Sequence, residues 1–194
     1  MTELGTLPDT RPYPWPYDGT WLVASTALVL CGWQEAFAGI GDQDAAALAG
    51  RAAGEWAAAG GPVVALSHAG LPARPVWLPA RGGRGAAPLP APETALSLLA
   101  YGWDGCFGSP LEAVLRSRGI THVVLAGLAA ELTVDSTVRT LNDRGFECLV
   151  LTDACTAVDP ELLAHAQHSL TMSGGIFGAL GRAVDVLHAL KEAP

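Results

Sequence analysis

HVVLAGLAAELTVDSTVRTLNDRGFECLVLTD, from His122 to Asp153, decides the fold of this chain. It begins with an apolar, β-branched run at 122–126, which is typical of a buried strand. After Gly127, apolar residues recur at helical spacing at Val134, Val138 and Leu141. Gly145 is the glycine expected after the last turn of a helix, and a second apolar run follows at 146–151. The stretch therefore predicts two parallel strands joined by a helix in a right-handed crossover.

Similar patterns on either side extend this unit into a sheet. Further buried strands are predicted at 26–31, 62–68 and 95–99. Helices are predicted from residue 110, with Ser109 as the cap and Pro110 at the first position, and also at about 43–59, 160–172 and 176–191. We expect a three-layer α/β fold, a mainly parallel sheet of about six strands with helices on both faces.

Two segments interrupt this alternation of strands and helices. Residues 1–20 are rich in proline and aromatic residues, and they predict an extended arm before a single domain at 21–194. Residues 70–92 are dense in glycine, proline and alanine, and a loop of that length is usually functional or mobile.

Composition excludes several classes of protein. Half of the 194 residues are hydrophobic and only 15% are charged, which is typical of a globular chain. The net charge of −8 and the lack of a Lys/Arg patch argue against nucleic acid as a partner. No apolar stretch is long enough to span a membrane, so a cytoplasmic location is the expectation. We expect the four cysteines to be reduced and mostly packed.

Ligands of open parallel sheets bind beyond the carboxyl ends of the strands. Here that edge is predicted to hold the loop from Gly127 to Leu132 and the helical turn at Thr133. His68 ends the predicted strand at 62–68 and falls at the same edge. A histidine there is either a hydrogen-bonded structural group or a catalytic one.

Several short motifs resemble the isochorismatase-like hydrolases, also called the cysteine hydrolase superfamily. The family pattern Gly-x-x-Thr-x-x-Cys-Val-x-x-Thr, followed by Asp-Ala, matches at Gly127, Val134, Thr137, Asp153 and Ala154. The pattern Asp-x-Gln-x-x-Phe matches at Gln34 and Phe37. The segment 102–111 resembles another family motif, and 15–19 resembles the arm of the biuret-hydrolase-like branch.

The resemblance implies a cysteine nucleophile, an aspartate base and a lysine, and none of the three is in place. The corresponding positions hold Thr133, Gly32 and Ala100. A threonine hydroxyl without a positioned base is inert near neutral pH, and we expect Thr133 to be a helix N-cap. The only lysine is Lys191, near the C-terminus. Of the cysteines, Cys106 has a better chance than Cys31 of reaching the crevice, because Cys31 adjoins position 32 on a strand and points to the opposite face.

Two functions are consistent with the resemblance. A third possibility is that the chain is an α/β domain unrelated to this family. The first is a degenerate homologue, a pseudoenzyme that binds a small molecule or acts as a subunit of a homo-oligomer or of a hetero-oligomer with an active paralogue. The second is an enzyme with rebuilt chemistry that uses His68, Asp104, Glu131 or Asp135. The expected ligand pocket is nearly neutral, needs no cofactor or metal, and is lined by Gln34, Phe37, His68, Trp103, Glu131 and Thr133, with Trp33 and Trp77 as further candidates.

Overall fold

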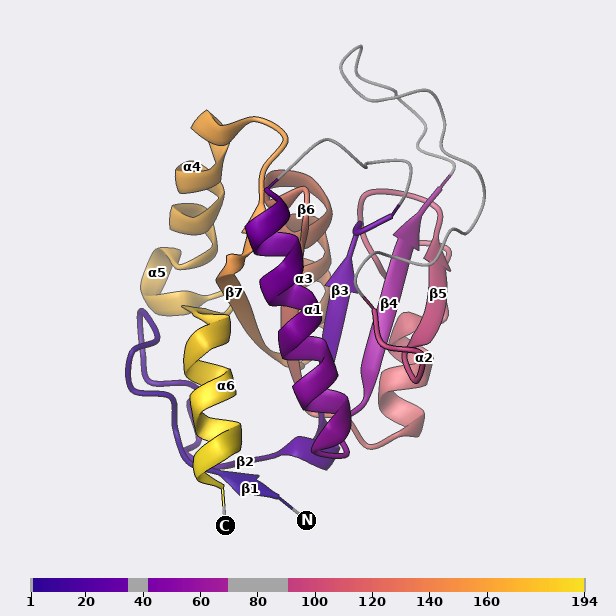
Figure 1. Cartoon of the computed structure of the whole chain (residues 1–194). Helices are drawn as coiled ribbons and strands as arrows, with labels where there is room; N and C mark the ends of the chain where they lie inside the picture. The colour runs from indigo at the N-terminus through magenta and orange to yellow at the C-terminus, as the bar shows by residue number, and fades with distance from the viewer. Residues whose placement is uncertain (1, 35–41, 70–90, 194) are drawn as a thin grey trace.

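The computed structural model describes residues 2–34, 42–69 and 91–193. In this part of the chain, a six-stranded sheet has the order β5-β4-β3-β6-β7-β8, and each neighbouring pair is parallel. Figure 1 shows helices in front of the sheet and behind it. The fold is therefore the predicted three-layer α/β fold. The strands are β3 (Thr26–Cys31), β4 (Val63–His68), β5 (Leu96–Ala100), β6 (His122–Leu128), β7 (Glu147–Thr156) and β8 (Ala179–Gly181).

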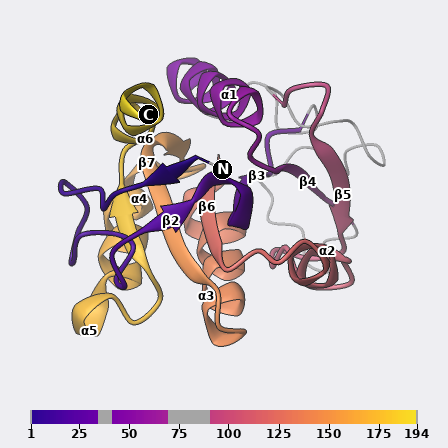
Figure 2. The same ribbon diagram turned by 90° about the horizontal axis from the view of Figure 1, so that it is seen from below.

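The helices form the two outer layers, which are separated in the view from below (Figure 2). One face of the sheet is covered by α1 (Gln43–Ala58) and α6 (Ala183–Glu192). The other is covered by α2 (Leu111–Ser117) and α3 (Asp135–Asp143), and α4 (Pro160–Leu170) contacts α3. The short α5 (Met172–Gly175) links α4 to β8.

Strand β3 explains why the core has two halves. All six of its residues are buried. Leu28 and Leu30 pack in the core under α1 and α6, while Val29 and Cys31 pack in the core under α2 and α3. A parallel strand covered on both faces favours apolar side chains at nearly every position, and this is why 27–31 is an uninterrupted apolar run after Thr26.

Two predicted boundaries were wrong. The apolar periodicity from 176 does not start a helix, because Ala179–Gly181 is an edge strand paired with β7 and α6 begins only at Ala183. Three residues are too few for periodicity to decide between strand and helix. Strand β7 also runs to Thr156, past a register shift against β6, so Asp153 lies within the strand and not after it.

The start of α2 is shifted by one residue from the prediction. The helix begins at Leu111, with Pro110 as its cap, and the Ser109 hydroxyl accepts a hydrogen bond from the Leu111 amide at 3.1 Å. Ser109 therefore satisfies a free amide of the first turn, as expected, but from just outside the helix.

The N-terminal residues pack on the amino edge of the sheet, at the lower end in Figure 1. Strand β1 (Glu3–Leu4) pairs with β2 (Trp21–Leu22), and Trp15 is fully buried with its ring edge-on to Trp21 at 4.8 Å. Trp21 in turn stacks on Trp56 of α1. The division into an arm at 1–20 and a domain at 21–194 stays a prediction. No helix in the described ranges combines the length and apolarity needed to cross a bilayer.

Candidate functional site

The strands bring the predicted site positions to one edge. Cys31 is level with Leu66 of β4 and with Gly127 of β6, and His68 is level with Ala100 of β5. Residues that end these strands therefore meet at the carboxyl edge. Next to them lies η3, a wide turn of π-helix at Ala130–Val134 that leads into α3.

Gly32 follows β3 directly and has no room for a side chain. Its φ is +68°, in the left-handed region that favours glycine, and its amide donates to the Leu66 carbonyl at 3.0 Å. A β-carbon at this position would lie 1.7 Å from the carbonyl oxygen of Leu128 and 3.3 Å from the Thr133 hydroxyl oxygen. Positions 32 and 133 are therefore neighbours, as the resemblance implies, but the backbone at position 32 admits only a hydrogen.

Thr133 is fully buried within the turn of η3, so its predicted role as a helix N-cap is wrong. Its hydroxyl lies 3.0 Å from the Leu128 carbonyl oxygen and 3.2 Å from that of Ala129, and it donates back to these carbonyls. The helical turn begins at Ala130, four residues earlier than a cap at Thr133 requires, and its cap position is Ala129. The only proton of the hydroxyl is thus engaged by the backbone.

Ala100 ends β5 and is completely buried. Its carbonyl oxygen accepts from the Ala69 amide at 2.8 Å. Lys191, the only lysine, lies near the C-terminus of α6, and that end of the helix is at the opposite end of the molecule from the carboxyl edge (Figure 1).

Gln34 fixes the end of β4. Its side-chain amide donates to the His68 carbonyl at 3.0 Å, and its side-chain oxygen accepts from the His68 amide at 2.6 Å. Both residues are buried. The amide of Gln34 therefore pairs with the backbone of His68 as another strand would, and it holds the histidine in one position.

The His68 ring is also fixed, through Nδ1, which lies 2.8 Å from the Gly102 carbonyl oxygen. A carbonyl only accepts, so Nδ1 carries the proton and Nε2 is left with a lone pair. Nε2 is buried and has no hydrogen-bond partner in the described part of the chain. Burial lowers the pKa of His68, although the Gly102 carbonyl and the charge of Asp104 oppose this effect. The ring is neutral and has one unused acceptor.

The aromatic candidates line the neighbouring core. Trp33 is buried, and Trp103 is half-buried and packs against the same cluster. The indole N–H of Trp33 has no acceptor among the described residues. Phe37 and Trp77, two further candidates, lie outside the described residues.

The candidate carboxylates each have backbone or side-chain partners. One oxygen of Glu131 accepts from the amides of Val158 and Asp159, which ties η3 to the loop before α4. Asp104 accepts from the Cys106 amide at 2.8 Å and from the Thr140 hydroxyl at 3.0 Å. Asp135 is paired with Arg139 through two hydrogen bonds, as the next turn of α3 allows.

All four cysteines lie among the described residues, and none is disulfide-bonded. Burial raises the pKa of every one of these thiols, to about 12 for Cys106 and Cys155 and further for Cys31 and Cys148. Cys106, the better candidate from the sequence, packs against the core under α2 and α3. A nucleophilic cysteine needs a lowered pKa, and no cysteine of this chain has one.

A second polar cluster lies at the amino edge, and sequence reasoning missed it. It consists of Asp18, His122 and Glu147. His122 and Glu147 are the first residues of the adjacent strands β6 and β7. The sequence predicts these two strands, but nothing in it places Asp18 beside them.

Comparison with known proteins places this fold in a family. Residues 26–179 match the Isochorismatase domain. An uncharacterized isochorismatase family protein, YecD, from Escherichia coli O157:H7 is 35% identical over 75 residues, which are 39% of this chain and 40% of YecD. The ureidoacrylate amidohydrolase RutB of Klebsiella pneumoniae subsp. pneumoniae is 34% identical over 91 residues, 47% of this chain and 38% of RutB. The matched stretches thus span less than half of these relatives.

Solved structures show the same fold along most of the chain. An isochorismatase family protein from Burkholderia thailandensis superposes with a TM-score of 0.74 at 23% identity, covering 88% of this chain and 97% of that one. For the nicotinamidase/pyrazinamidase PncA of Bacillus subtilis the TM-score is 0.69 at 17% identity, with 81% and 100% covered. Because the domain match covers most of its length, this chain belongs to the isochorismatase family.

Proposed function

We propose that this homologue of isochorismatase-family hydrolases is catalytically degenerate. On this proposal it binds a small molecule at the carboxyl edge, or serves as a subunit of a homo-oligomer or beside an active paralogue. Gly32 carries the proposal. The resemblance expects an aspartate there, and the Leu128 carbonyl oxygen occupies the space of a β-carbon. The shape of the backbone, and not only the identity of the residue, argues against a base at this position.

The thiols and Thr133 support the same conclusion. At a pKa of about 12, a thiol is almost entirely protonated near pH 7. The Thr133 hydroxyl sits at the position expected for the nucleophile, but it donates its proton to backbone carbonyls. A hydroxyl becomes a nucleophile when a base takes its proton, and a carbonyl oxygen is not such a base.

The polar atoms of the edge indicate what the ligand offers. Nε2 of His68 is an acceptor without a donor, and the indole N–H of Trp33 is a donor without an acceptor, among the residues that the structure describes. Leaving either buried and unpaired costs roughly 1–3 kcal/mol. A small aromatic or apolar molecule with one donor and one acceptor, such as an amide or a lactam, suits the chemistry of these two groups.

One observation favours rebuilt chemistry as a second candidate. The His68 ring is neutral, has a fixed tautomer and keeps Nε2 free, as a general base does. Asp104 and Asp135 have hydrogen-bond partners already, whereas only one oxygen of Glu131 is engaged and its Oε2 is buried without a partner among the described residues. This alternative therefore depends on His68, with Glu131 as the other candidate that keeps an unused acceptor. Its reaction would be a proton transfer that needs no cysteine.

A turnover assay separates the two candidates. The purified protein is tested against amides, ureides and isochorismate, alone and mixed with an active family member from the same organism. We expect no turnover by the protein alone, and either ligand binding or a changed rate in the mixture. Turnover by the protein alone that is lost in His68→Asn, and kept in the exposed control His188→Gln, supports rebuilt chemistry and overturns the proposed degeneracy.

A further inference from the structure

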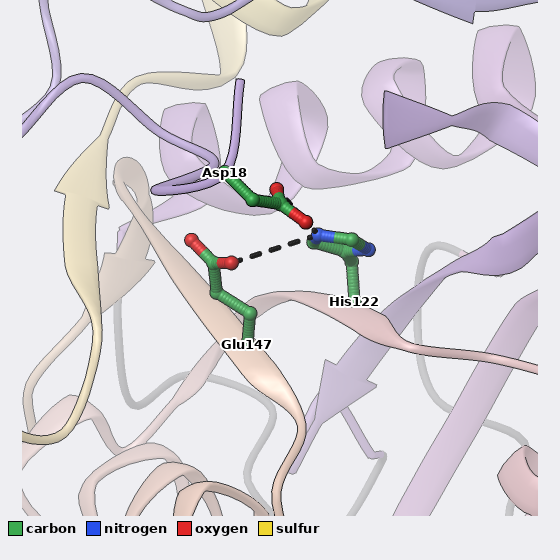
Figure 3. A group of neighbouring side chains, drawn as sticks. All are labelled: Asp18, His122 and Glu147. Carbon is green, nitrogen blue, oxygen red and sulfur yellow. Dashed lines mark ion pairs between the residues drawn. The ribbon is translucent and has the colours of Figure 1, made fainter. Parts of the chain in front are cut away.

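Three side chains from separate segments meet at the amino edge of the sheet, far from the candidate ligand site. His122 begins β6 and Glu147 begins β7, and the two residues are paired in register. Asp18 reaches them from the N-terminal segment. Figure 3 shows the two carboxylates directed at the same nitrogen of the imidazole ring.

The distances suit a shared cation better than direct hydrogen bonds. Nε2 of His122 lies 3.6 Å from Oε2 of Glu147 and 3.8 Å from Oδ1 of Asp18, and one ligand atom from each residue falls within 4.8 Å of the others. Both separations exceed hydrogen-bond length. Two ligand atoms that are each about 2.0–2.2 Å from a tetrahedral zinc ion lie roughly 3.4 Å apart, so a small inward movement of the side chains completes such a site.

In His122 and Glu147, the polar atom that does not face the cluster already has a hydrogen-bond partner. Nδ1 of His122 is 2.8 Å from the Thr121 hydroxyl oxygen, and the ring stands edge-on to Trp15 at 5.5 Å. The second oxygen of Glu147 accepts from the Tyr17 amide at 2.6 Å. Partners of this kind orient metal ligands, and the Thr121 hydroxyl can accept from Nδ1–H, the tautomer that leaves Nε2 with a lone pair for a metal. They leave Nε2 and Oε2 as the free atoms of His122 and Glu147.

The charge of the cluster also calls for a cation. Two carboxylates face one imidazole, and in the described ranges neither carboxylate has an ion pair with lysine or arginine. Asp18 is 70% exposed, so solvent and an ion reach the cluster from one side. An open side also leaves a position for a water ligand.

We propose that Asp18, His122 and Glu147 bind a divalent transition-metal ion such as Zn²⁺, with water in the fourth position. One nitrogen and two carboxylate oxygens form a ligand set that this class of ion accepts. The ion joins the N-terminal segment to the first residues of β6 and β7, so its role is to fasten that segment to the sheet. The site is independent of the proposed ligand site at the opposite edge.

The test is calorimetric titration of ZnCl₂ into the full-length protein after removal of metal with a chelator. We expect one ion per chain. Saturation near 100 times the dissociation constant raises the melting temperature by roughly 5–10 °C. The isosteric variants Asp18→Asn and Glu147→Gln weaken binding about ten-fold or more, because each loses a charged ligand. The Glu147→Gln variant still offers an acceptor to the Tyr17 amide, so its backbone contact is kept.

Two controls make the result specific. Asp9→Asn removes an exposed charge from the same segment, and His188→Gln removes the exposed His188–Glu192 pair on α6, which offers zinc two ligands of its own. Both keep the affinity of the wild type. The proposal is overturned if ZnCl₂ does not bind, or if Asp18→Asn and Glu147→Gln bind it as tightly as the wild type. The cluster is then a plain histidine–carboxylate contact.

Discussion

The carbonyl oxygen of Leu128 occupies the space that a side chain on Gly32 would need. A β-carbon added to Gly32 would lie only 1.7 Å from that oxygen. Because Leu128 ends β6 and Gly32 follows β3, the contact joins two central strands of the sheet at the candidate site. A substitution at position 32 must therefore move one of these strand ends.

Gly32→Ala is expected to destabilise the protein strongly. Gly119 is the matched control, since its φ of +66° is nearly that of Gly32 and no described atom lies within 4 Å of the place where its β-carbon would be. Gly119→Ala should cost about 1 kcal/mol, from the left-handed backbone alone. Gly32→Ala should cost roughly 2 kcal/mol more, because the close contact is added. Urea denaturation measures both, and equal losses would disprove the steric argument.

The native thiols should react very slowly. With a pKa of about 12 for Cys106 and Cys155, the thiolate fraction at pH 7.5 is on the order of 1,000-fold below that of an ordinary cysteine. Alkylation by iodoacetamide, followed by mass spectrometry, should thus be slower in the folded protein than in urea by roughly 100-fold or more. A cysteine that is alkylated as fast in the native state as in urea contradicts this account.

Gln34→Ala should lower the free energy of unfolding by about 1–3 kcal/mol, because the His68 amide and carbonyl lose their partner inside the protein. The exposed Gln43→Ala, at the start of α1, is the control and should change stability by less than about 0.5 kcal/mol. If the two variants are equally stable, the pairing of Gln34 with His68 does not hold the strand end.

Acid should destabilise the fold through His68. Its pKa in the folded protein lies below the ordinary 6.5, chiefly because of burial, so the unfolded chain takes up this proton first as the pH falls. Stability is therefore fully present above pH 6.5 and decreases below it, by up to about 1.4 kcal/mol per pH unit. His68→Asn, which keeps a donor for the Gly102 carbonyl, should flatten the profile below pH 6.5. An unchanged slope would mean that His68 does not titrate as described.

The sequence predicted the central sheet because its strands are buried on both faces. Residues 26–31 correspond to β3 without any shift, and the predicted helix at 43–59 corresponds to α1. Short elements at the edge of the sheet were less predictable. Strand β8 has three residues, and its identity depends on pairing with β7, a contact that local periodicity does not report.

Side-chain contacts were the main gap at the two sites, both within a turn and between distant segments. The resemblance gave the positions Gly32, Ala100 and Thr133, and the ends of the strands do meet at one edge. The sequence did not reveal that the Thr133 hydroxyl turns back to the Leu128 carbonyl, since this depends on the wide turn of η3. Contacts of this kind form only when the strands and their loops have assembled.

Intact-mass spectrometry during incubation with amide and ureide substrates tests the central claim most directly. A hydrolase that works through a cysteine passes through a covalent adduct on that residue. We predict that the mass of the protein stays constant and that no ammonia is released. An adduct that maps to one of the four cysteines, together with ammonia release, would contradict the claim that this family member has lost its nucleophile.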